Sequence, residues 1–497
     1  MPGILFTHSY FYRFDAKQWK ARQPYPPYGT IYAAAVMRAC GFDVALFDNN
    51  LRKKVSDILP ELAARKPDYL VIYDDGFNYL TKMCLTRMRE AAFELIASGK
   101  QHNCTVIVNS SDATDHYDAY LEKGADFVIP GEGEITLREL ILALEAGAES
   151  LSNIPGLAFR GSDSDRSITV RTAPRPVATD LDALPDPAWD LVDIEAYRQV
   201  WMRHHGYFSL NMATTRGCPF KCNWCAKPIY GNRYHSRSPE RVAAEIERLI
   251  GQYGVRHFWM ADDIFGLKPQ WVQRFRDVVK EKNLSFKYKI QSRVDLLLKE
   301  DTIDALVASG LQQVWVGAES GSQKILDAMD KGTTVNEIKE ASALLKKKGV
   351  EVCFFLQFGY LGETKEDIDA TWEMVQRLRP HDIGISVSYP LPGTGFYEKV
   401  KQLLGEKQNW SVSDDLTLMY PGTYPADYYR RLHRLVHKRF RLQQALEEWR
   451  KMWRGEKSNI LKAAKLAYYA PAALIDAWRL KRLERPRHLQ TGTSYGN

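Results

Sequence analysis

The stretch that decides the fold is Arg216-Gly-Cys-Pro-Phe-Lys-Cys-Asn-Trp-Cys225, which places cysteines at Cys218, Cys222 and Cys225. It follows directly on an apolar segment, 208–213, that predicts a strand. Three thiolates so close in the chain can converge on one metal centre. Iron–sulfur clusters normally take four thiolates, so three cysteines leave one iron open to chelate a substrate or cofactor. The stretch therefore predicts an iron–sulfur centre at a strand end.

Zinc is the competing metal, because it also binds thiolates. A zinc site here needs a fourth ligand, for which His235 is the candidate, and the usual paired CxxC arrangement is absent from the sequence. The remaining alternative is three unrelated thiols.

Outward from the cysteines, a strand and a helix alternate six times between about 208 and 400. Six such repeats predict a partial (β/α)6 barrel of the TIM type, with its active site at the carboxyl ends of the strands. The expected strands are 208–213, 257–261, 286–291, 313–317, 352–358 and 383–388.

The first 150 residues alternate in the same way and predict a doubly wound, Rossmann-like parallel sheet, so the whole chain is of the α/β class. Ligands of such sheets bind beyond the carboxyl ends of the strands, where this sequence has polar and small residues. Those residues equally suit turns, and this reading stays open. The expected strands are 4–6, 44–47, 70–73, 106–108 and 127–129.

Four regions are expected along the chain. Residues 1–150 form the Rossmann-like domain, 151–200 a proline-containing linker, 201–405 the partial barrel, and 406–490 a helical domain.

Composition narrows the class of protein further. The net charge of +7 over 497 residues is too small and too dispersed to indicate a nucleic-acid partner. The N-terminus lacks a secretory pattern, and the uncharged run 466–475 is far shorter than the ~20 residues of a membrane span. A cytoplasmic protein with reduced cysteines is expected.

The spacing CxxxCxxC, with Trp224 before the third cysteine, resembles the signature of the radical S-adenosylmethionine (SAM) superfamily. The resemblance implies a [4Fe–4S] cluster on Cys218, Cys222 and Cys225, with SAM on the fourth iron. One electron then releases a 5′-deoxyadenosyl radical from SAM. The residues at the other strand ends that match the family's SAM contacts are Asp262, Asp263, Gln291, Ser292, Arg293, Glu319, Ser320 and Gln357.

Outside the barrel, three stretches resemble the cobalamin-binding branch of this superfamily, which includes methylases and the anaerobic magnesium-protoporphyrin ester cyclase. They are 24–29, 124–137 and the linker segment Leu184-Pro-Asp-Pro-Ala-Trp189. The resemblance implies a cobalamin site at the strand ends of the first domain. Its candidate residues are Tyr73, Asp74, Asp75, Gly76, Ser110, Ser111, Gly131 and Glu132.

One departure affects the cobalt ligand. Many cobalamin proteins carry Asp-x-His-x-x-Gly after the first strand, but this chain has Thr7-His8-Ser9-Tyr10-Phe11 there. His8 is therefore not assigned to cobalt, and the lower face of the cobalt is expected to meet residues near 73–78.

The resemblance implies a methyltransferase that acts on an unactivated carbon or a phosphorus of a small molecule. An oxidative cyclase or rearrangement enzyme with the same cofactors is the alternative, and a cobalamin or metal sensor or scaffold is the non-enzymatic one. A flavodoxin or ferredoxin is expected to supply the electron. No general base is identified. Aromatic and basic residues beyond 410 predict either a packed core or a peripheral membrane contact through the C-terminal helices.

Overall fold

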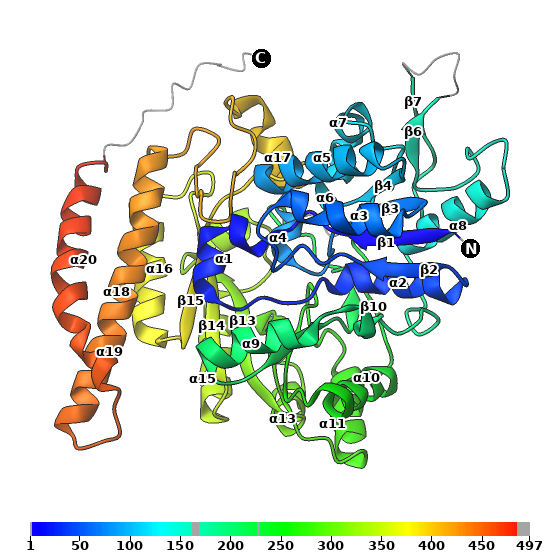
Figure 1. The fold of residues 1–497 in the computed structure, drawn as a ribbon. Coiled ribbons are helices and arrows are strands. Elements are labelled where there is room, and N and C mark those ends of the chain that lie inside the picture. Colours follow the sequence, from blue (N-terminus) through cyan, green and yellow to red (C-terminus); the bar gives the residue numbers. More distant parts are fainter. Residues whose placement is uncertain (1, 162–167, 226–228, 485–497) are drawn as a thin grey trace, which may run out of the picture.

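The computed structural model describes residues 2–161, 168–225 and 229–484. Two α/β layers lie one above the other, and a pair of long helices flanks them at one side (Figure 1). The expected α/β class is confirmed. Residues 485–490 of the expected helical domain lie outside the described residues.

The N-terminal sheet has the strand order β2-β1-β3-β4-β5-β6-β7, and β1 to β5 are parallel. The chain order reverses between β1 and β3, which is the switch point where open sheets of this kind bind ligands. The strands are β1 (Gly3–Thr7), β2 (Asp43–Leu46), β3 (Tyr69–Tyr73), β4 (Thr105–Asn109), β5 (Phe127–Val128), β6 (Ala158–Arg160) and β7 (Thr169–Arg171).

All five strands expected in the first domain are present. Strands β6 and β7 extend the sheet by antiparallel pairing into the segment expected as a linker. They are only three residues each, too short to leave a clear alternation in the sequence. The helices of this layer are α1 (Ala16–Ala21), α2 (Tyr28–Ala39), α3 (Leu59–Arg65), α4 (Tyr79–Lys82), α5 (Thr86–Gln101), α6 (Ser111–Asp115), α7 (Tyr117–Glu122) and α8 (Glu134–Glu145).

The second sheet is an open six-stranded half-barrel in the order β15-β14-β13-β12-β11-β8, with every neighbouring pair parallel. All six expected barrel strands are present. They are β8 (Ser209–Met212), β11 (His257–Met260), β12 (Lys287–Ser292), β13 (Leu311–Glu319), β14 (Glu351–Phe358) and β15 (Asp382–Val387).

Amphipathic helices cover the outside of the half-barrel. Helix α10, for example, is capped by the Ser238 side chain and buries Val242, Ile246 and Leu249. A small hairpin of β9 (Thr215–Arg216) and β10 (His235–Ser236) encloses the cysteine segment. The helices are α9 (Ile194–His205), α10 (Pro239–Tyr253), α11 (Pro269–Glu281), α12 (Val294–Leu297), α13 (Thr302–Ala308), α14 (Gln323–Ala328), α15 (Val335–Lys347), α16 (Lys365–Leu378) and α17 (Gly395–Val400).

The C-terminal part is a helical hairpin at the edge of the molecule (Figure 1). It consists of α18 (Ala426–Trp453), the short α19 (Ile460–Ala464) and α20 (Leu466–Lys481). Helix α18 packs against α16 on one side and α20 on the other. None of the described helices is long and apolar enough to cross a membrane.

Candidate active site

The cysteine segment begins where β8 ends, and a buried carboxylate fixes its start. Asp262, just beyond β11, accepts hydrogen bonds from the backbone N–H and the hydroxyl of both Thr214 and Thr215 at 2.6–3.0 Å. Burial outweighs these bonds and raises the pKa of Asp262 to about 6. Both carboxylate oxygens of Asp262 therefore already accept hydrogen bonds from the protein. Asp262 positions the cysteine segment by holding the backbone that leads into it.

The turn into the cysteines requires glycine. Gly217 has a φ of +79°, and a Cβ there would lie 2.1 Å from the carbonyl oxygen of Arg233. Any side chain would push apart the β9–β10 hairpin. Residues 217–225 are here called the cysteine loop. Because residue 217 is glycine, the start of this loop can lie directly against the backbone that leads into β10.

Asn223 anchors the middle of the loop. Its backbone N–H donates to the carbonyl of Met329 at 3.1 Å, and its carbonyl accepts from Phe396 N–H at 2.7 Å. Its side-chain amide donates to Asp330 and accepts from the Tyr360 hydroxyl at 2.6 and 2.8 Å. The loop is therefore held by segments that follow β13, β14 and β15, and its two flanking residues, Cys222 and Trp224, are fixed with it.

The three thiols share this loop with basic neighbours. Cys218 and Cys222 are half-buried and Cys225 is exposed. Desolvation by nearby atoms, followed by the charges of the other two thiols, raises the pKa of Cys225 to about 12. The guanidinium of Arg293 donates to Cys222 Sγ at 3.6 Å and lies 3.8 Å above the Phe220 ring.

As the side chains lie, no group of three His, Cys, Asp or Glu in the described residues is close enough to hold a metal ion. The three thiols are thus neighbours on one loop but do not converge on a single metal ion, and residues 226–228 lie outside the description. His235, the fourth ligand of the zinc alternative, pairs with Arg216 in the small hairpin, and its Nε2 has no hydrogen-bond partner among the described residues.

The expected SAM contacts lie at the carboxyl ends of adjacent strands, here called the barrel rim. Glu319 ends β13 with a φ of +55°, at an irregularity in the pairing with β14. This conformation is costly for a residue other than glycine. It places the carboxylate 3.0 Å from the buried ammonium of Lys331, which also lies over the Trp224 ring at 5.6 Å.

Some of the other expected SAM contacts already have hydrogen-bond partners within the protein, and others do not. Ser292 donates to the carbonyl of Phe265, and Gln357 donates to Ser388, both at 2.8 Å. The Ser320 hydroxyl is bonded to that of Thr371. Gln291 on β12 and Asp263 after β11 are only partly buried. The Gln291 side chain is open to a ligand, whereas the Asp263 carboxylate is already paired with Lys82.

The carboxyl ends of the N-terminal strands form a second edge, here called the N-terminal rim. Its two aspartates serve the protein backbone. Asp74 accepts from the N–H and hydroxyl of Ser9 at 2.7 and 2.8 Å. Asp75 accepts from Tyr28 and Gly29 at the start of α2 and from Phe77. Both have a pKa raised by burial.

The remaining expected residues of the N-terminal rim have fewer hydrogen bonds to the protein than the two aspartates. Ser110 caps α6 through its hydroxyl, and Ser111 beside it is half-buried. Gly131 has a φ of +78° and open space where a Cβ would be. Tyr73 is buried against Gly133, where a Cβ would meet its ring at 2.9 Å.

His8 belongs to an internal network. Its Nε2 lies 2.9 Å from Asp48, whose other oxygen accepts from the Tyr197 hydroxyl at 2.6 Å. The ring is buried, and its Nε2 is engaged by Asp48 and by the Asn49 N–H. This arrangement agrees with leaving His8 unassigned to cobalt.

The two rims face each other, and three contacts join them. Arg216 forms buried ion pairs with Glu132 and with Glu134, the latter at 2.8 Å. Lys82, at the end of α4, forms an ion pair with Asp263.

Phe77 stacks on Tyr230 with ring centroids 5.1 Å apart. A Cβ at the neighbouring Gly76 would lie 2.8 Å from the Tyr230 hydroxyl, so the two layers touch closely here. The expected site residues of the two domains are therefore brought to one interface.

Sequence reasoning missed Arg216, Lys82, Lys331 and Asn223 as parts of this site. Arg216 and Asn223 lie inside the quoted cysteine stretch, so their position was signalled but their partners were not. Lys82 and Lys331 lie in no recognisable motif.

A buried carboxyl in the turn after β14 leads to a prediction about pH. Glu363 accepts from the Gly359 N–H at 2.6 Å, its other oxygen has no partner in the part of the chain that the structure describes, and burial raises its pKa to about 8. Its ordinary value is 4.5, so the folded state holds the proton that the unfolded chain loses between about pH 4.5 and 8. The stability contribution is fully present below that window and declines as the pH rises through it.

Glu363→Gln is therefore expected to gain about 4 kcal/mol relative to the native protein between about pH 5 and 9. Urea unfolding of both proteins across this range measures the difference. The same change at exposed Glu366 is the control and should show no such gain. A difference that stays constant with pH would mean that Glu363 is ionised in the folded protein.

Comparison with known proteins agrees with this geometry. Residues 212–375 match the family model described as the radical SAM superfamily. An uncharacterized methyltransferase of Pyrococcus horikoshii is 28% identical over 377 residues, which cover 75% of this chain and 78% of the relative. The anaerobic magnesium-protoporphyrin IX monomethyl ester cyclase of Rubrivivax gelatinosus is 25% identical over 81% of this chain and 70% of its own.

Among solved structures, the radical SAM methyltransferase TsrM from Kitasatospora setae, with cobalamin and a [4Fe–4S] cluster bound, has a TM-score of 0.66. It is 20% identical, and the match covers 81% of this chain and 75% of the other. The likeness shows that the two chains share a fold.

Proposed function

We propose that this chain, whose residues 212–375 match the radical SAM superfamily, is a cobalamin-dependent radical SAM methyltransferase acting on an unactivated carbon or phosphorus of a small molecule. The observation that carries the proposal is the meeting of the two rims. The cysteine loop and the switch point of the N-terminal sheet lie on opposite sides of one interface, joined by Arg216, Lys82 and Phe77. Two cofactors held by these rims would share one substrate between them.

The residues of the cysteine loop suit an iron–sulfur cluster. Three thiols on one loop are the donors that such clusters use, and three leave one iron open. Arg293 and Lys331 place positive charge beside the thiols, as an anionic cluster requires. The Trp224 Nε1–H is buried without an acceptor among the described residues, and it offers a hydrogen bond to a group bound at the loop.

The N-terminal rim suits a large planar cofactor less specifically. Gly131 leaves open space, and Ser111 offers a hydroxyl at the same edge. We propose that these two residues contact cobalamin directly, with Tyr73 and Ser110 behind them. Asp74, Asp75 and Glu132 would shape the site through the backbone and Arg216, because their carboxylates already have partners.

When bound, the cluster supplies the electron that cleaves SAM to a 5′-deoxyadenosyl radical, and cobalamin supplies a transferable methyl group. The protein orients these groups and excludes water from them. Asp263 and Gln291 are the half-buried rim residues proposed to bind SAM, and Glu319 is held for the same task by Lys331. Ser292, Arg293, Ser320 and Gln357 are proposed to complete that site.

We propose that a flavodoxin or ferredoxin delivers the electron and that the enzyme works in the cytoplasm, where its cysteines stay reduced. Oxidative cyclisation or rearrangement is the second candidate function, since a curated cyclase matches 81% of the chain. A sensor or scaffold is the non-enzymatic alternative, but such a protein has no need for a strained Glu319 paired with Lys331 beside the cysteine loop.

The products distinguish these candidates. The full chain, purified without oxygen and reconstituted with iron, sulfide and hydroxocobalamin, is expected to retain cobalt and to convert SAM to both 5′-deoxyadenosine and S-adenosylhomocysteine when its substrate is present. A cyclase yields 5′-deoxyadenosine with no methylated product. Iron without cobalt would overturn the methyltransferase proposal, and a chain that holds zinc in place of iron would overturn both enzymatic ones.

A further inference from the structure

Large apolar side chains that face solvent are concentrated in the C-terminal hairpin. In the described residues, nine of the sixteen exposed large hydrophobic side chains lie within 449–478. The five most exposed of the sixteen are all among them, from 63% for Tyr468 to 80% for Leu461, whereas none elsewhere exceeds the 56% of Ile168. The nine are Trp449, Met452, Trp453, Ile460, Leu461, Tyr468, Leu474, Ile475 and Trp478. A cluster of this kind on a protein surface marks an interaction site.

The orientation of α20 is fixed by its inner side. Ala473, Asp476 and Leu480 are buried toward α18, and Asp476 is paired with Lys438 at 2.6 Å. The residues between them, Leu474, Ile475 and Trp478, must then point outward. Since Asp476 is the one acidic residue of α20, the outward side of this helix carries no negative charge.

Positive charge borders the same side. Over 449–484 the sequence has nine Lys and Arg against three acids. Lys465, Arg479, Lys481 and Arg482 are exposed along α20 and at its end. The guanidinium of Arg482 lies 3.5 Å above the ring of Trp478, an amphipathic pair typical of the depth of lipid headgroups.

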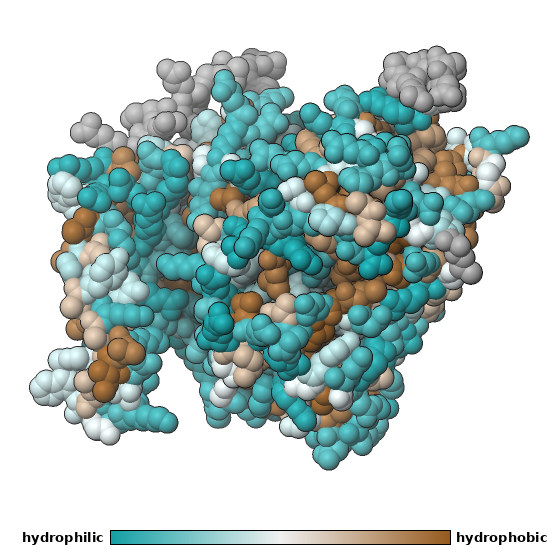
Figure 2. Space-filling view, in the orientation of Figure 1, coloured by the Kyte–Doolittle hydropathy of each residue, from teal (hydrophilic) through white to brown (hydrophobic). Residues whose placement is uncertain are grey.

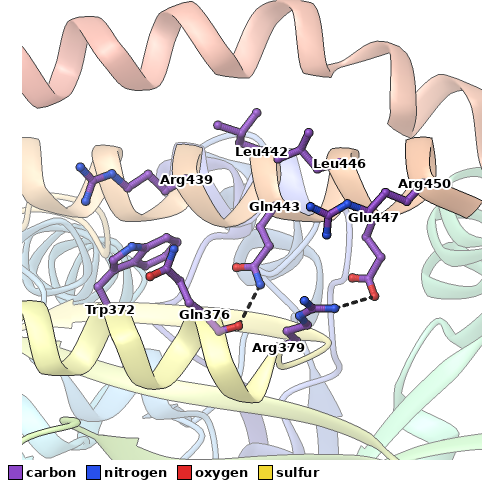
Figure 3. Close-up of a pocket in the computed structure, with 9 residues that line it drawn as sticks. All are labelled: Trp372, Gln376, Arg379, Arg439, Leu442, Gln443, Leu446, Glu447 and Arg450. Atoms are coloured by element: carbon purple, nitrogen blue, oxygen red, sulfur yellow. Dashed lines mark hydrogen bonds and ion pairs between the residues drawn. The ribbon is translucent and has the colours of Figure 1, made fainter.

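The opposite side of α18 is polar and basic. Arg379, Arg439 and Arg450 line a groove of about 560 Å³ between α16 and α18. In Figure 3, Leu442 and Leu446 point from α18 toward α20. Arg379 is paired with Glu447 at 3.6 Å. The hairpin thus carries its exposed apolar surface on the outer helices, and Figure 2 shows such surface at the lower tip, where α19 lies.

From this combination we propose that α19, α20 and the end of α18 form a peripheral docking surface for an anionic lipid membrane. The apolar face would enter the headgroup region, and the flanking basic residues would contact lipid phosphates. A second copy of the chain would bring like charges together. The proposal is independent of the radical chemistry.

Vesicle flotation with the full chain tests the proposal. It should float with vesicles that contain one third phosphatidylglycerol, far less with pure phosphatidylcholine, and less at high salt. The triple variant Leu461→Ser, Leu474→Ser, Trp478→Ser should lower the partition coefficient roughly tenfold or more. Lys465→Gln with Arg479→Gln and Lys481→Gln should lower it about 100-fold for anionic vesicles alone.

The matched control is Leu142→Ser with Met202→Ser and Leu403→Ser, three exposed apolar side chains outside the hairpin. It should bind like the native protein, and circular dichroism should show that all variants stay folded. Failure of the native chain to float with anionic vesicles would overturn the proposal. So would an equal loss in the control, or a dimer in sedimentation velocity that the hairpin substitutions dissociate while vesicles stay unbound.

Discussion

Replacing Cys222 by alanine is expected to abolish iron binding by the reconstituted protein. The native chain should retain about four irons, the content of one [4Fe–4S] cluster, and the variant close to none. Cys222 is the central thiol of the loop, accepts the hydrogen bond from Arg293, and adjoins the anchored Asn223. Two thiols cannot hold a cluster that three hold with one iron open. Iron and sulfide analysis after anaerobic desalting measures the loss.

Two other cysteines provide matched controls. Cys40 is exposed and Cys353 is buried in β14, and neither lies near the loop. Cys40→Ala and Cys353→Ala should keep the iron content of the native protein. Iron retained in Cys222→Ala would contradict the assignment of the loop, and equal loss in Cys353→Ala would show that the loss reflects a general loss of folding.

Replacing Arg216 by methionine, which removes its guanidinium, is expected to lower the free energy of unfolding by about 3–5 kcal/mol. Arg216 is 4% exposed and lies between Glu132 and Glu134, so its removal leaves two buried carboxylates without a counter-charge. It also lies 5.0 and 5.6 Å from the rings of Tyr230 and Phe77. Equilibrium urea unfolding measures the loss.

A neutral version of the same network separates charge from packing. In Arg216→Met combined with Glu132→Gln and Glu134→Gln no charge is left buried, so most of the lost stability should return. Arg274→Ala removes an exposed pair with Glu240 and should cost less than about 1 kcal/mol. If Arg216→Met were as mild as Arg274→Ala, the rims would be joined by something other than this ion pair.

The fold could be read from the sequence because its signals are local. Each barrel strand is a short apolar run followed by a helical period. The runs at 257–261 and 383–388 differ from β11 and β15 by at most one residue at each end. The short β6 and β7 had no such signal, because three residues pair as strands only when an existing edge accepts them.

The candidate site divides in the same way. Short stretches of sequence were enough to locate the cysteine loop and the strand ends. They also carried the family resemblance of both domains. The carboxylates Asp74 and Asp75 were expected as ligand contacts, yet they hold the backbone of Ser9 and of α2. An aspartate that follows a strand has the same sequence pattern whether its carboxylate contacts a ligand or a helix N-terminus, so the sequence does not distinguish the two roles.

The sequence alone therefore determined the α/β class, the order of the two domains and the cysteine loop. Tertiary structure alone decided how the two rims meet. Arg216 pairs with Glu132, which is 84 residues away in the sequence, and Lys82 pairs with Asp263, which is 181 residues away. Likewise, only the packing of α20 on α18 decides that Leu474 faces outward while Asp476 is buried. Spacing and periodicity report on neighbours along the chain, whereas the partners of a buried charge are chosen by which surfaces fold against each other.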